Sequence, residues 1–540
     1  MAAQSKVREL RFPAGGVFRR LGFRDSADIQ TVRDSGGMKS HHSTPWAVNC
    51  RPEDPIAKRL RGGSRPGLVK FCDTKLGTDI TDLLALNVSS ASGAETLVAA
   101  VVDDVLAVLD VGTGTVTYPT GLLETDSGAD GIFNDEGTHQ LLIASGSVAA
   151  PCFLVARGQM IYAISTTGVT TLDVKTGLMN TLTATAGTIP TGCTFGCVYR
   201  DRLVLAGGDN AVYMSRQGDP TDWDYGADVE DAGRAVTFQL SEAGKVGGVV
   251  TALVPHHDAY LLAATANDLW TVQGDPAASG TLRSVTSDVG IVSQAAWVET
   301  TIGLVFLGSH DLWRVGPDGG GLENLSKGKM PDELRNMDYE PATITLGWNQ
   351  DEAGVYLFLS PPPDDGSHWY FDLGQAGFWP MNLQAGHQPL AAAEVENEMV
   401  VASADGYLRC FYPGNDDGTA IQSHVIIGPL PMGPPATFGR VVNLHGCLGD
   451  DSGAVTWSIV TGDTAEEAVE NAKKAIGYFD GGETALYAAL VKATGTLAAG
   501  RSHLAYPKIR AVWIAIWLRS TVQWAFEGIT IETAQSGRWR

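Results

Sequence analysis

The stretch that decides the fold is Asp201–Tyr225, which reads DRLVLAGGDNAVYMSRQGDPTDWDY. Side chains alternate on both sides of Gly207–Asn210, a Gly-Gly-Asp-Asn sequence whose residues tolerate positive φ. This pattern predicts two antiparallel strands joined by a tight turn. An acidic segment with aromatic residues follows the second strand. The block therefore favours a chain built from short strands and turns.

The same arrangement recurs through the middle of the chain. Each unit has an apolar run, a turn, a second run, a polar corner, and a third run that often carries Tyr or Trp. Repeats of about 40–50 residues that are rich in strand and turn signals are typical of β-propeller blades. We expect an all-β propeller of six or seven blades; a pair of β-sandwiches with similar hairpins is the alternative. The corners align at Asp104, Gly158, Asn210, Asp268, Asp311, Gly366 and Gly406.

The two ends of the chain differ from the middle. Residues 1–70 have little periodicity and many Gly, Pro and Arg residues, which predicts an extended arm. From about residue 415 the pattern predicts a β-rich, sandwich-like platform domain with one helix at Thr464–Ile476, where Thr464 and Glu467 form a capping box. The predicted organisation is an N-terminal basic arm (1–70), a propeller (71–414) and a C-terminal platform (415–540).

Charge is distributed unevenly along the chain. The net charge is −23, although residues 1–70 carry 14 Lys and Arg against 6 Asp and Glu, and residues 501–540 carry 6 against 2. The part between them is therefore strongly acidic. Such a body repels a phosphate backbone and gains no counterion release from nucleic acid. The basic ends are suited to docking on an acidic protein or to local contact with nucleic acid; simple solubility is the alternative explanation of the acidity.

No targeting or membrane segment is expected. Met1–Phe12 lacks the apolar core of a signal peptide, and the apolar segment Ala511–Phe526 is short and interrupted by Arg519. The seven cysteines form no disulfide framework, which is typical of reduced, mostly buried thiols made in a cytoplasm.

Three groups of residues are candidates for metal binding. Asp219–Asp231 is either a calcium loop or a solvated acidic loop, and it lacks the later bidentate Glu of the calcium motif. Cys193 and Cys197 are either zinc ligands or core thiols, without a second ligand pair. The pairs His41-His42 and His256-His257 are adjacent in sequence, so on a strand the two rings should point to opposite faces. We therefore expect no metal and no cofactor.

Catalytic motifs are missing from the sequence. It contains no Gly-x-Ser-x-Gly elbow, no phosphate-binding Walker loop and no His-Glu-x-x-His motif. We expect a protein that is not an enzyme. One basic cluster stands out instead, and it is either a solvated loop or a docking site for an acidic neighbour. Its arginines are Arg51, Arg59, Arg61 and Arg65.

The block Asp201–Tyr225 contains the pattern R-L-x-x-A-G followed by V-Y-x-S-x-x-G-D-P-x-x-W. It resembles the tail nozzle proteins of short-tailed bacteriophages, the tail tubular protein B and packaged-DNA-stabilisation group. Further segments are similar to that family in the same order along nearly the whole chain. They are Phe12–Arg20, Asn49–Arg51, Arg61–Leu68, Leu269–Gly274, Leu325–Leu334 and Trp524–Arg538.

The resemblance implies a structural virion protein, assembled in the bacterial host cytoplasm. It implies a homohexameric ring below the head-to-tail adaptor, with a propeller in each subunit, contacts to fibres or spikes, and a central channel that retains and then releases double-stranded DNA. An acidic lumen would let the phosphate polymer slide without sticking. Two alternatives are a glycan hydrolase on a propeller scaffold and an independent propeller that serves as an interaction module.

Overall fold

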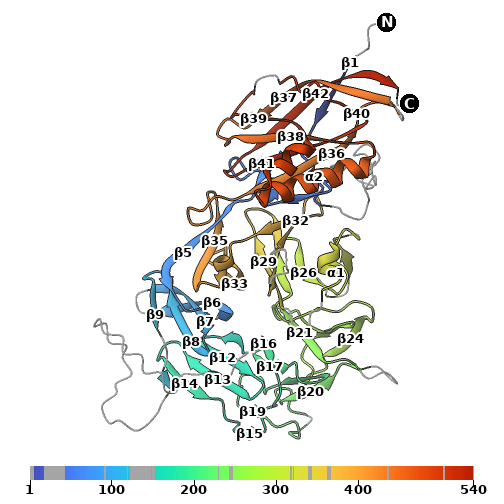
Figure 1. The fold of residues 1–540 in the computed structure, drawn as a ribbon. Helices are drawn as coiled ribbons and strands as arrows, with labels where there is room; N and C mark the ends of the chain where they lie inside the picture. The colour runs from blue at the N-terminus through green and yellow to red at the C-terminus, as the bar shows by residue number, and fades with distance from the viewer. Residues whose placement is uncertain are drawn as a thin grey trace.

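The fold is a ring of small sheets joined to a two-sheet sandwich (Figure 1). The computed structural model describes residues 5–17, 43–78, 80–90, 93–117, 120–121, 148, 152–228, 230–241, 247–316, 319, 321–326, 328–337, 343–361, 367–434, 437–502 and 505–538. Gly366, one of the expected corners, and His41-His42 lie outside these residues.

Seven antiparallel sheets form the propeller within the described residues. In chain order, the first six are β6–β9 (Ile80–Ser90, Gly93–Val102, Val105–Asp110, Thr115–Thr117); β11–β14 (Phe153–Arg157, Met160–Ser165, Gly168–Asp173, Leu178–Thr181), extended by the parallel β10 (Thr120–Gly121); β16–β18 and β20 (Phe195–Tyr199, Arg202–Ala206, Ala211–Met214, Val236–Gln239); β21–β24 (Val250–His256, Tyr260–Thr265, Leu269–Gln273, Thr281–Thr286); β25–β28 (Trp297–Thr300, Gly303–Leu307, Leu312–Val315, Leu322–Asn324); and β29–β32 (Thr343–Asn349, Gly354–Ser360, Ser367–Asp372, Gly377–Asn382).

The seventh sheet closes the ring with a strand from the other end of the propeller. Its strands are β33–β35 (Pro389–Val395, Glu398–Ser403, Tyr407–Tyr412) and β5 (Gly67–Lys75). β5 pairs antiparallel with β35, so that Leu68 lies opposite Phe411 and Val69 opposite Cys410. This pairing leaves no first or last blade with an unpaired side, which is how propellers limit exposed edges.

Apolar side chains bury neighbouring blades against each other, and aromatic residues lie between them. Tyr162 of β12 packs in one cluster with Leu203 of β17. Trp270 of β23 shares a cluster with Phe195 of β16. Each blade thus covers a face that its neighbour could not bury alone.

One corner of the expected repeat is wrong. Asp104, Asn210, Asp268, Asp311 and Gly406 lie between the second and third strands of their sheets. Gly158 instead lies between the first and second strands, β11 and β12. The reason is that β12 and β13 both carry apolar residues on two faces, so sequence pattern alone does not distinguish them.

The sandwich combines the two ends of the chain. One sheet has the order β1 (Ser5–Leu10), β42 (Phe526–Arg538), β37 (Thr437–Leu448) and β40 (Arg510–Ala511). The other has the order β2 (Ala47–Val48), β36 (Ser423–Pro431), β41 (Trp513–Ser520), β38 (Val455–Gly462) and β39 (Val491–Leu497). Strand β1 of the arm adds to the edge of the first sheet through antiparallel pairing with β42.

A helix covers the outer face of the five-stranded sheet. α2 (Ala465–Asp480) buries a stripe of small apolar residues, including Ala472 and Ala475, against Trp517 of β41. Alternate residues of β41, such as Ile516, face the other sheet. Both faces of β41 are therefore covered, which explains its nearly continuous burial.

The remaining elements are short. They are β3 (Cys50–Arg51) and β4 (Gly63–Ser64), the parallel pair β15 (Ala186–Gly187) and β19 (Asp222–Trp223), the helices α1 (Asp332–Arg335) and α3 (Thr484–Leu490), and the 3-10 turn η1 (Ala385–His387). Among the described residues, no helix has the length and apolar character needed to cross a membrane.

One hydrophobic core joins the propeller to the sandwich. The ring of Phe12 stacks on Trp379 of β32, with centroids 5.6 Å apart. On its other sides the same ring contacts Trp524 (6.1 Å) and Phe526 (6.0 Å) of the sandwich. Gly62, at φ +83°, lies so close that a Cβ atom there would overlap the Phe12 ring. The arm thus fills the joint between the two parts.

We expect Thr464→Ala to loosen the start of α2. Thr464 Oγ accepts a hydrogen bond from the Glu467 backbone N–H (3.1 Å), and Glu467 in turn accepts from the Asp463 backbone N–H (2.8 Å). Loss of such a cap costs about 1 kcal/mol. Hydrogen exchange of the first-turn amides should accelerate by about fivefold. Thr464→Ser, which keeps the hydroxyl, is the control; equal exchange in both variants would contradict the capping role.

Candidate functional site

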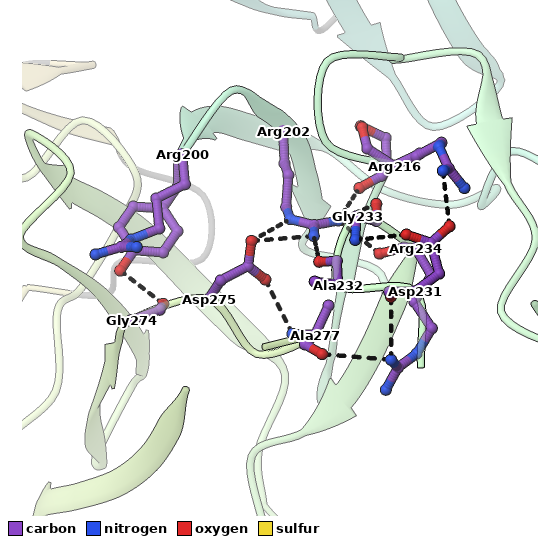
Figure 2. Close-up of polar contacts among 12 residues, drawn as sticks. Arg200, Arg202, Arg216, Asp231, Ala232, Gly233, Arg234, Gly274, Asp275 and Ala277 are labelled. Atoms are coloured by element: carbon purple, nitrogen blue, oxygen red, sulfur yellow. Dashed lines mark hydrogen bonds and ion pairs between the residues drawn. The ribbon is translucent and has the colours of Figure 1, made fainter. Parts of the chain in front are cut away.

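The block Asp201–Tyr225 is built around a buried arginine. As predicted, β17 and β18 form a hairpin across the turn at 207–210. Arg202 lies on β17, is fully buried, and donates from Nε and Nη2 to Asp275 Oδ2 at 3.2 and 3.0 Å. Its other N–H groups donate to main-chain carbonyls of a loop in its own blade (Figure 2). These carbonyls belong to Ser215 (2.8 Å), Ala232 (3.1 Å), Gly233 (3.3 Å) and Arg234 (2.6 Å).

This arrangement fastens two neighbouring blades together. Asp275 follows β23 in the next sheet, and its Oδ1 accepts from the Ala277 backbone N–H at 2.9 Å. Tyr199, at the end of β16, donates from its hydroxyl to the Gly274 carbonyl at 3.0 Å. A buried guanidinium with a carboxylate and several carbonyl acceptors is fully satisfied inside the protein. Arg202 is the arginine of the R-L-x-x-A-G pattern, but nothing in the sequence indicates that it is buried or that its partner is Asp275.

The acidic loop uses its carboxylates to form turns. Asp219, Asp222, Asp224, Asp228 and Asp231 each accept from the backbone N–H group two residues further along. This Asx-turn pattern is a common use of Asp in loops. Hydrogen bonds from Thr221 hold the pKa of Asp219 below its usual range. Each of these five aspartates therefore uses one carboxylate oxygen to form a turn of the loop.

The two cysteines of the Cys-x3-Cys segment lie in different apolar clusters. Cys193 packs with Leu203 and Trp223, whereas Cys197 packs with Val204 and Val212. Burial raises the pKa of Cys193 to about 12 and raises the pKa of Cys197 as well. Both thiols are free and protonated, in agreement with the core-thiol alternative.

The expected orientation of His256 and His257 is wrong. β21 ends at His256, and His257 has φ +47°, so the strand alternation stops between them. Both rings consequently approach one carboxylate, Glu299 on β25 of the next blade. Sequence reasoning missed Glu299 because it lies 42 positions beyond His257 and has no motif around it.

The four arginines predicted to dock on an adaptor occupy different environments. Arg51 and Arg65 are buried, 2% and 1% exposed, so no partner can reach them in this conformation. Arg61 forms ion pairs with Asp54 (2.8 Å) and Glu527. Arg59 is exposed. The docking prediction therefore needs correction for Arg51 and Arg65, whose side chains are buried, and it stays a prediction for Arg59 and Arg61.

Arg65 connects the arm to the ends of two blades. Its Nη1 and Nη2 atoms donate to the two carboxylate oxygens of Asp416 at 2.8 and 2.6 Å. The remaining N–H groups donate to the side chain of Asn49 (2.9 Å) and to the carbonyls of Pro66 (2.8 Å) and Asn382 (3.2 Å). All five N–H groups thus have acceptors, and the pair is bidentate, the strongest form of such contacts.

Arg51 lies over aromatic rings at the same joint. Its guanidinium carbon is 4.1 Å from the centroid of Tyr370 and 5.4 Å from that of Tyr356. Both tyrosines donate to Glu352, Tyr356 to Oε2 (2.5 Å) and Tyr370 to the carbonyl (2.8 Å). Burial raises the pKa of nearby Asp372 to about 6. The result is a polar cluster closed off from solvent by packing.

The cavity at this cluster is small. It has a volume of about 10 Å³ and is lined by Arg51, Glu53, Glu352 and Tyr370 among others. Ligand pockets usually span about 300–1,000 Å³. A wider depression of about 230 Å³ lies on the sandwich between Asp463 and Arg510, and Phe438 is the one aromatic residue in its lining.

The sequence matches no protein-family model and no curated protein. Among solved structures, the chain is similar to the computationally designed Ika8 protein (14% identity, 64% of this chain and 99% of that chain, TM-score 0.37). It is also similar to a chain of the mitotic checkpoint complex (11% identity, 63% and 97%, TM-score 0.37). A third likeness is to the extracellular domain of the two-component system BT4673 from B. thetaiotaomicron (9% identity, 72% and 45%, TM-score 0.40). These values carry no conclusion about function.

We expect Arg65→Ala to destabilise the whole protein. The substitution leaves the Asp416 carboxylate buried without its cation, which costs about 3–5 kcal/mol. The melting temperature measured by calorimetry should fall clearly. Arg59→Ala, an exposed change in the same segment, should alter stability by no more than about 0.5 kcal/mol. Equal melting temperatures for the two variants would rule out the role assigned to Arg65.

We also expect stability to decrease as the pH rises from about 4 to about 6. Because the folded Asp372 carboxyl binds its proton more tightly than the unfolded one, its stabilising contribution is complete below about pH 4 and is lost as the pH rises through its folded pKa of about 6. The change is roughly 2–3 kcal/mol. Melting temperatures of the wild type and Asp372→Asn across this range test it. The exposed Asp351→Asn is the control and should keep the wild-type slope.

Proposed function

We propose that this chain is a structural subunit of the tail nozzle of a short-tailed bacteriophage. In this proposal six copies form a ring below the head-to-tail adaptor in the virion. The ring provides the exit channel for double-stranded DNA, retains the packaged genome, allows its ejection, and anchors fibres or spikes. The role of such a subunit is mechanical: it must transmit force between neighbouring subunits without unfolding.

The observation that carries the proposal is the joint between propeller and sandwich. A single core around Phe12, together with the buried Arg65–Asp416 pair, makes the two parts one rigid unit. A freely hinged pair of domains would be expected to have a small, polar interface instead. Rigid coupling suits a subunit that holds a pressurised genome at one side and receptor-binding appendages at another.

The resembling motifs support the same proposal because they lie at structural positions. Arg202 and Trp223 of the first block are both buried. Arg202 binds Asp275 of the next blade, and Trp223 packs in one cluster with Leu203 of β17. Arg65 and Trp524 of the terminal motifs lie at the joint. Buried residues at such positions stabilise the fold of the subunit. The acidic body adds support, since a phosphate polymer slides past carboxylates without being bound.

The mass of the purified protein in solution tests the proposal. Light scattering on the chain alone and mixed with the neighbouring adaptor should reveal an assembly of about six copies, formed alone or only on the adaptor. A stable 57.0 kDa monomer that ignores the adaptor would contradict it. In that case, activity of the monomer on surface glycans would favour the hydrolase, and inactivity the independent interaction module.

A point variant is the appropriate test of docking through the arm. Deleting residues 1–70 would remove β1 and part of β5, and so damage both the sandwich and the ring closure. Arg59→Glu changes an exposed charge and leaves these strands intact. Weakened adaptor binding by a variant that melts like the wild type would support docking there. Unchanged binding would contradict it.

A further inference from the structure

A cluster of two histidines and one glutamate lies between the fourth and fifth blades. His256 is the last residue of β21, His257 begins the turn that follows, and Glu299 lies on β25. His256 Nδ1 is 3.2 Å from Glu299 Oε1, and His257 Nε2 is 3.6 Å from the same oxygen. The three ligand atoms all lie within 4.8 Å of one another. Among the described residues, this is the one group of three such side chains that converges in this way.

The separations fit the geometry of a small divalent ion. Zinc binds imidazole nitrogen at about 2.0–2.1 Å and carboxylate oxygen at about 2.0–2.2 Å, so tetrahedral ligand atoms lie about 3.4 Å apart. The two nitrogen–oxygen separations, 3.2 and 3.6 Å, lie on either side of that value. The side chain of His257 is 80% exposed and that of Glu299 46% exposed, so both can adjust to an ion that enters from solvent.

A second observation points to a ligand. His256 Nδ1 is buried and makes no hydrogen bond with any described residue, although a carboxylate oxygen lies nearby. A buried polar atom without a hydrogen-bond partner lowers the stability of the folded protein. A metal ion held between the imidazole and the carboxylate would satisfy it, because neutral imidazole nitrogen is a good ligand for zinc and nickel.

The backbone around the cluster is already fixed. The ring of Tyr260 stacks on His256 with centroids 4.8 Å apart. The side chain of Asp258 accepts from the backbone N–H of Arg200 in the preceding blade at 2.9 Å, which anchors the turn. The Ala259 backbone N–H donates to the His256 carbonyl at 3.2 Å. The positive φ of His257 is thus maintained by contacts that do not involve a metal, and the ligands are preorganised.

We propose that His256, His257 and Glu299 form a binding site for one divalent transition-metal ion, of the zinc or nickel class. Water completes the coordination on the open side. The ion would link the first strands of two neighbouring blades at the end of β21. This inference does not depend on the proposed function.

Metal titration of the full-length protein tests the site. After treatment with a chelator, the protein is titrated calorimetrically with ZnCl2 and, separately, NiCl2. The wild type should bind one ion per chain at this site and gain thermal stability with rising metal concentration. His257→Ala and Glu299→Gln should each weaken binding by more than about 100-fold, since even indirect partners of a metal ligand are worth 10–100-fold.

Matched variants separate this site from other histidines. His310→Ala changes an exposed histidine elsewhere on the fifth blade, and His41→Ala with His42→Ala removes the other adjacent pair. Both controls should bind like the wild type. Electron paramagnetic resonance with Cu²⁺ gives an independent readout, in which coupling to two imidazole nitrogens should fall to one in His257→Ala. Wild-type binding by His257→Ala and Glu299→Gln, or no saturable binding by the wild type, would overturn the proposal.

Discussion

The arrangement of the whole chain depends on one buried ion pair, Arg65 with Asp416. Removing a guanidinium from water is favourable only when every N–H group finds an acceptor, and here all five do. Asp416 also accepts from the backbone N–H of Leu68, the second residue of β5. The same carboxylate therefore fixes the arm, the closing strand of the propeller and the exit from β35. Moving any one of these segments would separate Arg65 from Asp416 and leave a buried charge without its partner.

The apolar joint extends this constraint to the sandwich. Phe12 contacts Trp379 on one side and Trp524 on another, so the arm is enclosed by elements of both parts. Polar contacts define the register of the joint, and aromatic rings pack at its centre. Polar and apolar contacts are combined in the same way within the propeller. Arg202 positions one blade against the next, and apolar clusters fill the space between the two blades.

Local features of the sequence were enough to predict the hairpin at 207–210 and the start of α2 at Thr464, because turn residues and caps act over a few positions. The all-β propeller and the sandwich followed from repeated local patterns. Arg65 could not be assigned in the same way, since its partner Asp416 is 351 positions away. The convergence of His256 and His257 was missed for another reason: a left-handed residue at a strand end reverses the alternation on which the expectation rested.

The pairing of β5 with β35 has a consequence for the order of synthesis. The ring cannot close until a ribosome has made the 351 positions that separate Arg65 from Asp416, which takes roughly 20–70 s at about 5–20 residues per second. During that interval β5 has an unpaired edge, and β1 of the arm has no partner until β42 has been made. Nascent chains of this protein therefore need protection from one another during translation, and slow growth or a chaperone that holds strand edges should increase the yield of folded protein.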